Sequence, residues 1–188
     1  MSVIEINGLT KDYGNQKGLF DVSFTIEKGE ILGFLGPNGS GKTTLIRHLM
    51  GFIKPDQGSV SIMNLDCFAQ SPKIQEMVGY LPGEIAFMDE MRGIDFIKFI
   101  AEMKKIKDLS RAKELIDFLE LDPTNKIKRM SKGMKQKIGL VIAFMQDCPI
   151  LILDEPTSGL DPLMQNKFVE LIKRAKAEGK TVLMSSHI

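Results

Sequence analysis

Residues 36–44 read Gly36-Pro37-Asn38-Gly39-Ser40-Gly41-Lys42-Thr43-Thr44. The stretch follows the apolar run 31–35 and precedes residues 44–50, which favour a helix. A glycine, four residues and then Gly-Lys-Thr, between a strand and a helix, is the pattern of a phosphate-binding loop. Glycines at 36, 39 and 41 allow backbone conformations that a Cβ forbids, so successive amide N–H groups can face one anion. The stretch therefore predicts a nucleotide-phosphate site.

The helix that starts at the end of this loop strengthens the prediction. A helix start leaves N–H groups unpaired and carries roughly half a positive charge, which favours phosphate. Lys42 is placed to reach the β- and γ-phosphates, and the Thr43 hydroxyl is placed to bind Mg²⁺. The alternative, a glycine turn that only joins a strand to a helix, does not explain the fixed spacing of these residues.

Composition narrows the class of protein. The 188 residues include 25 basic and 24 acidic side chains, a net charge of +1, so no overall field attracts nucleic acid or anionic lipid, and nucleic acid is not expected as a partner. The longest apolar runs, 138–145 and 150–153, are far shorter than the ~20 residues that cross a bilayer, and residues 1–6 lack the features of a signal peptide. We expect a cytoplasmic protein in which Cys67 and Cys148 are reduced.

Hydrophobic periodicity predicts an α/β fold. Alternating segments indicate half-buried strands of an antiparallel layer, at 3–7, 22–27 and 58–62. Continuous apolar runs indicate parallel strands covered on both faces, at 31–35, 150–153 and 181–185. Helical spacing dominates between them, and Ser110 is expected to cap one helix. We predict one domain with a helical subdomain, 85–146, inserted into a core formed by 1–84 and 147–188.

Two carboxylates follow the apolar run 150–153. Asp154 is placed to hold Mg²⁺ through water, and Glu155, on the opposite side of the strand, can polarise an attacking water molecule. A solvated acidic strand end is the alternative, but it leaves the neighbouring phosphate loop without a catalytic group. The pair predicts the hydrolytic half of the site.

With these motifs in this order, the chain resembles, over nearly its whole length, the nucleotide-binding domain of an ATP-binding-cassette (ABC) transporter. The resemblance implies an α/β P-loop NTPase with a RecA-like parallel sheet, an antiparallel β subdomain and an α-helical subdomain. It implies ATP and Mg²⁺ as ligands, with Tyr13 stacked on adenine rather than serving as an ordinary surface or core aromatic. His187, after the strand at 181–185, matches the family's switch histidine, which contacts the γ-phosphate and the catalytic region.

Met130-Ser131-Lys132-Gly133-Met134 stands where the family has the signature Leu-Ser-Gly-Gly-Gln. Ser131 is expected to cap the following helix. The resemblance implies that Ser131 and Gly133 contact the γ-phosphate of a nucleotide bound by a second subunit, in a homodimer or heterodimer. It also implies that Ser158-Gly159-Leu160-Asp161 touches that subunit, and a helix is expected to begin at Pro162.

The function implied is an ATPase subunit that powers transport through separate integral membrane subunits, at the inner face of the cell membrane. The signature form and Leu81-Pro82-Gly83-Glu84 are similar to those of bacterial exporters. We expect these membrane subunits to dock on a groove near Ile85, Ala86, Phe87, Met88 and Met91, whose apolar side chains belong either to the membrane contact or to the core.

Two features depart from the family pattern. Gly83 stands where the family has a glutamine that contacts Mg²⁺ or the attacking water, so we expect Glu84 or a bound water to take that role. Family domains generally continue for several dozen residues beyond the switch histidine, whereas this chain ends at Ile188, as expected of a fragment or of a naturally short protein.

The main alternative is a non-transport ABC ATPase that acts on ribosomes or DNA. Ribosome-acting members generally carry two cassettes, and chromosome-structure members separate the phosphate loop from the signature by a long coiled coil; neither pattern is present here. A GTPase or kinase is a further alternative, but the chain lacks an Asn-Lys-x-Asp guanine motif.

Overall fold

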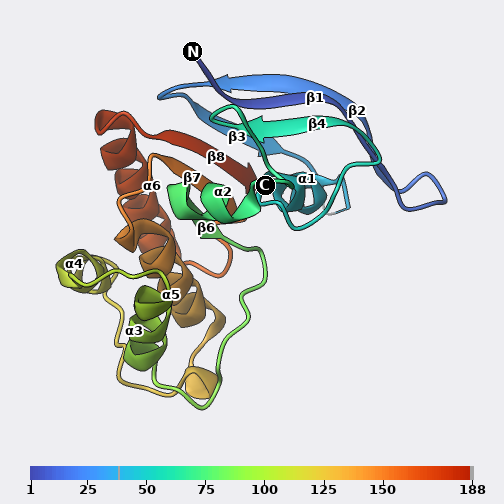
Figure 1. Ribbon diagram of the computed structural model, residues 1–188. Coiled ribbons are helices and arrows are strands. Elements are labelled where there is room, and N and C mark those ends of the chain that lie inside the picture. The colour runs from blue at the N-terminus through green and yellow to red at the C-terminus, as the bar shows by residue number, and fades with distance from the viewer. Residues whose placement is uncertain (38, 187–188) are drawn as a thin grey trace.

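The computed structural model describes residues 1–37 and 39–186 (Figure 1). The strands are β1 (Ser2–Asp12), β2 (Gly18–Glu27), β3 (Ile31–Leu35), β4 (Gln57–Ile62), β5 (Leu65–Asp66), β6 (Val78–Leu81), β7 (Ile150–Asp154) and β8 (Thr181–Ser186). The α-helices are α1 (Lys42–Leu49), α2 (Ser71–Met77), α3 (Gly93–Met103), α4 (Ser110–Phe118), α5 (Lys132–Met145) and α6 (Pro162–Ala177), and a short 3₁₀ helix, η1, covers Ile127–Arg129.

The strands form an antiparallel sheet and a parallel sheet, as the sequence predicts. The antiparallel sheet has the order β2-β1-β4-β5, and the parallel sheet has the order β3-β8-β7-β6. In the parallel sheet β7 lies between β6 and β8, with Asp154 opposite Ser185. Figure 1 shows α3, α4 and α5 gathered at the end of the molecule away from the antiparallel sheet.

Strand β7 is covered on both faces, which explains its unbroken apolar sequence. Ile150 and Ile152 join the apolar cluster that contains α1 and the antiparallel sheet. Leu151 and Leu153 join the other cluster, which contains the helices α3 to α6. Because successive strand residues point to opposite faces, a strand between two layers needs apolar residues at every position. The end of β7 is thereby held at a fixed place between the two layers.

The prediction for residues 31–35 is confirmed in part. They form β3, a parallel strand as expected, with Ile31 packed against the helical cluster and Leu32 and Phe34 against the other. None of the five residues is fully buried, however, and among the described residues β3 pairs with β8 alone, at the edge of the sheet. Its last side chain, Leu35, is 73% exposed. A short apolar run cannot distinguish a central strand from an edge strand, because the difference lies in how many neighbours the strand has.

Of the three helix starts expected from the sequence, two are confirmed, at Ser131 and at Pro162. Ser131 caps α5, where its hydroxyl accepts from the N–H of Met134, and Asp161 caps α6 directly before Pro162. Ser110 is not a cap, because it is already the first residue of α4 and its own N–H and hydroxyl donate to Asp108. Across residues 1–37 and 39–186, no helix has the length and apolar character needed to cross a membrane.

Candidate nucleotide-binding site

The loop before α1 has the backbone that its glycines predict at two positions. Gly39 and Gly41 have φ angles of 84° and 94°, in the region that side chains other than glycine rarely adopt. Gly36 is different, because its φ is not positive; a Cβ there would lie 2.8 Å from the hydroxyl of Ser40. The requirement for glycine at 36 is therefore a close approach within the loop rather than an unusual φ.

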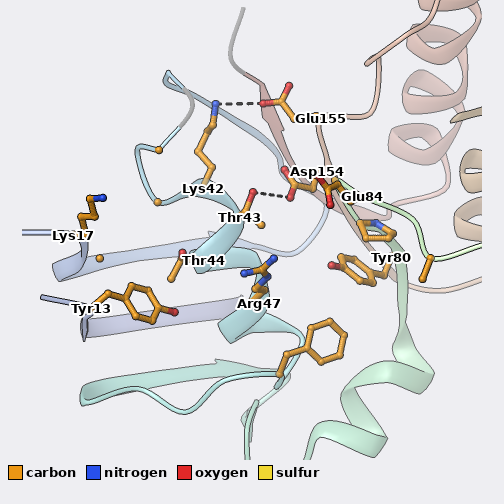
Figure 2. Close-up of a pocket in the computed structure, with 17 residues that line it drawn as sticks. Tyr13, Lys17, Lys42, Thr43, Thr44, Arg47, Tyr80, Glu84, Asp154 and Glu155 are labelled. Atoms are coloured by element: carbon orange, nitrogen blue, oxygen red, sulfur yellow. Dashed lines mark hydrogen bonds and ion pairs between the residues drawn. The ribbon is translucent and has the colours of Figure 1, made fainter. Parts of the chain in front are cut away.

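A cavity of about 950 Å³ opens beside this loop (Figure 2). Eight of its lining residues are site residues predicted from the sequence: Tyr13, Gly39, Gly41, Lys42, Thr43, Thr44, Asp154 and Glu155. Gly36, Pro37 and Ser40 belong to the same loop but do not line the cavity. Asn38 and His187, also predicted to bind or act here, lie outside the described residues.

Lys42 is a nearly buried cation that lines the cavity. It is 7% exposed, and its ammonium donates to the carbonyl of Gly36 and, at 2.9 Å, to the carbonyl of Ser186. The same Nζ lies 3.3 Å from Oε1 of Glu155 (Figure 2). These contacts fix the charge between the phosphate loop and the ends of β7 and β8, where it can meet an anion.

Thr43, Asp154 and Ser185 form a chain of hydrogen bonds. The hydroxyl of Thr43 donates to Oδ2 of Asp154 at 3.0 Å, and the hydroxyl of Ser185 donates to Oδ1 at 2.6 Å. Asp154 is 1% exposed, so both of its oxygens are fixed by these donors. One hydroxyl and one carboxylate are the oxygen donors that Mg²⁺ prefers. These side chains fit the ion that the sequence predicts, either directly or through water.

Glu155 has an unusual backbone. Its φ is 50°, a left-handed conformation that is uncommon for a residue other than glycine. Its N–H donates to the hydroxyl of Ser185 at 3.1 Å, and its carbonyl accepts from the N–H of Ser158. Residues held in such conformations cluster at functional sites, where the surrounding structure imposes them.

Tyr13 lies at the far end of the cavity from the carboxylates, beside Lys17 (Figure 2). The Tyr13 side chain is 54% exposed. An exposed ring is not required by the core, and it leaves a face on which a base can stack.

A second group of aromatic and cationic residues lines the cavity and was not predicted from the sequence. Phe52 and Tyr80 meet edge to face with ring centroids 5.8 Å apart, and Arg47 lies near them (Figure 2). Burial, with a smaller effect of the Asp154 charge, raises the pKa of Tyr80 to about 12, so the phenol stays neutral. These residues lie on α1, the loop after it and β6, and their spacing in the sequence gives no sign that they meet.

Gly83 lies directly against the predicted metal ligand. A Cβ at this position would be 2.9 Å from Oδ2 of Asp154, the oxygen that accepts from Thr43. Glu84, the next residue, lines the same cavity (Figure 2). The carboxylate of Asp154 therefore occupies space that a side chain at 83 would need, and a neighbouring side chain reaches the cavity instead.

The helix start at Ser131 does not line this cavity. A Cβ on Gly133 would lie 2.8 Å from the carbonyl oxygen of Gly159, so the signature segment packs against the loop 158–161. Gln136, one turn further along α5, reaches the segment that carries Glu155, and sequence reasoning missed it. The available signal was a polar residue four positions before Leu140, on the inward face of the helix.

Three of the five apolar residues near the predicted docking groove belong to the core. Ile85, Phe87 and Met91 are partly buried and pack against the helical core, with the ring of Phe87 centred 5.4 Å from that of Phe96. Ala86 and Met88 are exposed.

The fold and the cavity together define a class of protein. A parallel sheet, a glycine loop that leads from β3 into α1, and carboxylates at the end of the buried strand β7 are the parts of a P-loop nucleotide hydrolase. The family model described as "ABC transporter" matches residues 19–158. The chain belongs to the ABC transporter family of ATP-binding proteins.

Individual relatives agree with this assignment. The chain is 39% identical to the uncharacterized ABC transporter ATP-binding protein YdbJ of Bacillus subtilis over 190 residues, 99% of this chain and 61% of YdbJ. It is 34% identical to the bacitracin transport ATP-binding protein BcrA of Bacillus licheniformis, over 100% of this chain and 62% of BcrA. The dimeric structure of MJ0796, a bacterial ABC transporter cassette, superposes with a TM-score of 0.87 at 25% identity, covering 98% of this chain and 88% of that one.

Proposed function

We propose that this protein binds ATP with Mg²⁺, hydrolyses it, and thereby powers transport, in the export direction, through separate integral membrane subunits. The observation that supports this most is that Lys42 and Thr43 of the phosphate loop meet Asp154 and Glu155 in one cavity. The relatives named for ABC transport, BcrA among them, support the transport half of the proposal. The inner face of the cell membrane is the corresponding location.

The phosphate-binding half of the reaction follows from the cavity. Tyr13 stacks on adenine, while Lys42 and the backbone N–H groups of residues 36–44 bind the phosphates. Thr43 and Asp154 would hold Mg²⁺, which when bound neutralises charge on the β- and γ-phosphate oxygens. Asn38 is retained as a loop ligand on the resemblance alone.

The hydrolytic half depends on Glu155. Its carboxylate accepts a proton from the water that attacks the γ-phosphate, an effect typically worth about 10²–10⁴ in rate. When the phosphate oxygens bind Lys42, the ion pair between Lys42 and Glu155 is weakened. The carboxylate of Glu155 is then able to bind the attacking water instead. His187 is retained as a γ-phosphate contact on the resemblance alone.

We further propose that two ATPase subunits, identical or related, enclose two nucleotides between them. Ser131 and Gly133 of one protomer would contact the γ-phosphate bound by its partner, which agrees with their position outside the cavity of their own chain. Residues 85–146 would then turn as a helical subdomain on the core formed by 1–84 and 147–188. Closing and opening of the dimer would move the membrane subunits between two conformations.

Dimer formation tests the proposal. In the Glu155→Gln variant, ATP should stay bound, so light scattering should show a dimer with saturating Mg²⁺-ATP and a monomer with ADP. Adding Ser131→Ala should prevent that dimer, with a loss of stability of only about 1 kcal/mol from the missing cap. A Glu155→Gln variant that stays monomeric with saturating ATP would contradict the proposal. The transport half predicts a polytopic membrane protein in the neighbouring reading frame.

A further inference from the structure

Gln136 is a buried polar side chain that the roles above do not use. It is 7% exposed, and its amide Nε2 donates to the backbone carbonyl of Pro156 at 2.9 Å and to that of Glu155 at 3.3 Å. A buried carbonyl that loses its donor pays the cost of desolvation without compensation. The amide therefore ties α5, the helix that begins after Ser131, to the backbone of the proposed general base.

The Glu155 backbone needs such support because of its conformation. With φ at 50°, it persists only because its surroundings hold it. Ser185 on β8 accepts from its N–H at 3.1 Å, and Ser158 donates to its carbonyl at 3.1 Å. Gln136 is the contact in this set that comes from the helices between β6 and β7.

The start of α5 touches the same segment at a second place. A Cβ on Gly133 would lie 2.8 Å from the carbonyl oxygen of Gly159, and a Cβ on Gly159 would lie 3.0 Å from the side chain of Lys132. Gly159 follows Ser158, which bonds to Glu155. A shift of α5 along or about its axis must therefore move the loop and the Glu155 carbonyl, or break these contacts.

We infer that Gln136 is a positioning residue that fixes the Glu155 backbone relative to α5, so that the carboxylate is placed for hydrolysis only when α5 is in register with β7. This rests on the proposed function, in which the start of α5 meets the partner's nucleotide. Gln136 then links the engagement of that nucleotide to the base that acts on the chain's own nucleotide. It touches neither nucleotide.

Hydrogen exchange of the nucleotide-free protein tests whether Gln136 holds this segment. Gln136→Met removes both donations while keeping the length of the side chain, and should speed exchange of the Glu155 and Ser158 amides about tenfold, the factor for one hydrogen bond. Gln75→Met is the matched control, because Gln75 also donates its amide to a backbone carbonyl, that of Met50, at 3.2 Å. Gln136→Asn, one methylene shorter, gives the same test in a second variant. Unchanged exchange at both amides overturns the inference.

A double-mutant cycle tests the catalytic consequence. Gln136→Met should lower kcat by about ten- to a hundredfold, the range for a misplaced catalytic group, and change KM less than about twofold. In a protein that already carries Glu155→Gln, Gln136→Met should cause no further loss of kcat. If Gln136 were purely structural, Gln136→Met would lower kcat by the same factor with and without Glu155→Gln. Additive losses overturn the inference. If the Glu155→Gln variant turns over as fast as the wild type, the proposed function is contradicted rather than the role of Gln136. The hydrogen-exchange experiment then still decides whether Gln136 holds the segment.

Discussion

The ammonium of Lys42 lies 3.3 Å from Oε1 of Glu155, so the cation proposed to bind phosphate and the proposed general base are paired with each other. Both are well shielded from solvent, with side chains 7% and 21% exposed. A triphosphate that binds Lys42 competes with this carboxylate for the same charge. In the proposed mechanism, nucleotide that binds Lys42 would therefore free Glu155 to accept a proton from water.

Glu155→Gln separates these two effects. The neutral amide competes less for Lys42 and cannot accept the water proton. We expect the Kd for ATP, measured by fluorescence titration, to stay equal or fall, while kcat drops by at least about a hundredfold, the lower end of the general-base range. Undiminished turnover in this variant would assign the base elsewhere.

Tyr13 should determine the affinity for adenine. Replacing it by alanine removes the stacking surface and should weaken ATP binding by about 1–3 kcal/mol, while Tyr13→Phe should bind as the wild type does. Calorimetric titration measures both variants. Because the side chain is 54% exposed, neither change should move the urea midpoint of unfolding appreciably, which separates binding from folding. Equal affinity in all three proteins would place adenine elsewhere.

Gly83→Ala should displace the predicted metal ligand Asp154 by a steric contact, because the added methyl group forms no hydrogen bond. The new Cβ would lie 2.9 Å from Oδ2 of Asp154, whose other oxygen is fixed by Ser185, so the bond from Thr43 has to lengthen. We expect the Mg²⁺ concentration for half-maximal hydrolysis to rise about tenfold or more, as for other changes behind a metal ligand. An unchanged Mg²⁺ dependence would show that Asp154 can move freely.

Glu84→Ala tests a different idea, that this carboxylate takes the place of the glutamine expected at position 83. Glu84 lines the cavity, and its loss should lower Mg²⁺-dependent hydrolysis while leaving the binding of ATP without metal unaffected or slightly stronger, because a negative charge is removed. Hydrolysis that is untouched by the change leaves the role to bound water.

His48 should make stability depend on pH. It is 1% exposed, Nδ1 donates to the carbonyl of Thr44 at 2.8 Å, and Nε2 has no partner among the described residues. Burial lowers its pKa below the usual 6.5, with a smaller effect from Lys11 in the same direction; the Thr44 bond and Asp56 oppose it. The folded state therefore resists the proton that the unfolded state takes up.

The sign follows from this difference in proton uptake. The contribution of neutral His48 to the free energy of unfolding should be complete above pH 6.5. As the pH falls below 6.5, the free energy of unfolding should decrease by at most about 1.4 kcal/mol per pH unit, until the folded-state pKa is reached. Urea unfolding of wild type and His48→Gln between pH 7.5 and 5 measures it. The two curves should have different slopes in that interval, and parallel curves would exclude His48 as the cause.

The sequence predicts the parts of this fold whose signal is local. The phosphate loop, the cap at Ser131 and the start of α6 at Pro162 each depend on a few adjacent residues, and the structure has them where expected. The edge position of β3 depends on distant pairings and could not be predicted. The cap expected at Ser110 is wrong, because its hydroxyl and N–H donate to Asp108, two residues earlier.

The candidate site shows the same limit. The sequence indicates Lys42, Thr43, Asp154 and Glu155, because the first two belong to a recognisable phosphate-loop pattern and the last two directly follow a buried strand. Gln136 was not predicted, because its partners are carbonyls that any residue would carry. Likewise, the close packing of Gly83 against Asp154 could not be predicted, because the sequence shows only that position 83 lacks a side chain.

The left-handed backbone of Glu155 lowers the stability of the fold at the residue proposed to act in hydrolysis. A glycine there would relax a strain of order 1–3 kcal/mol, so a search for thermally hardened variants would favour a substitution that removes the proposed general base. If stability alone were selected, the gain would come at the expense of the proposed hydrolysis.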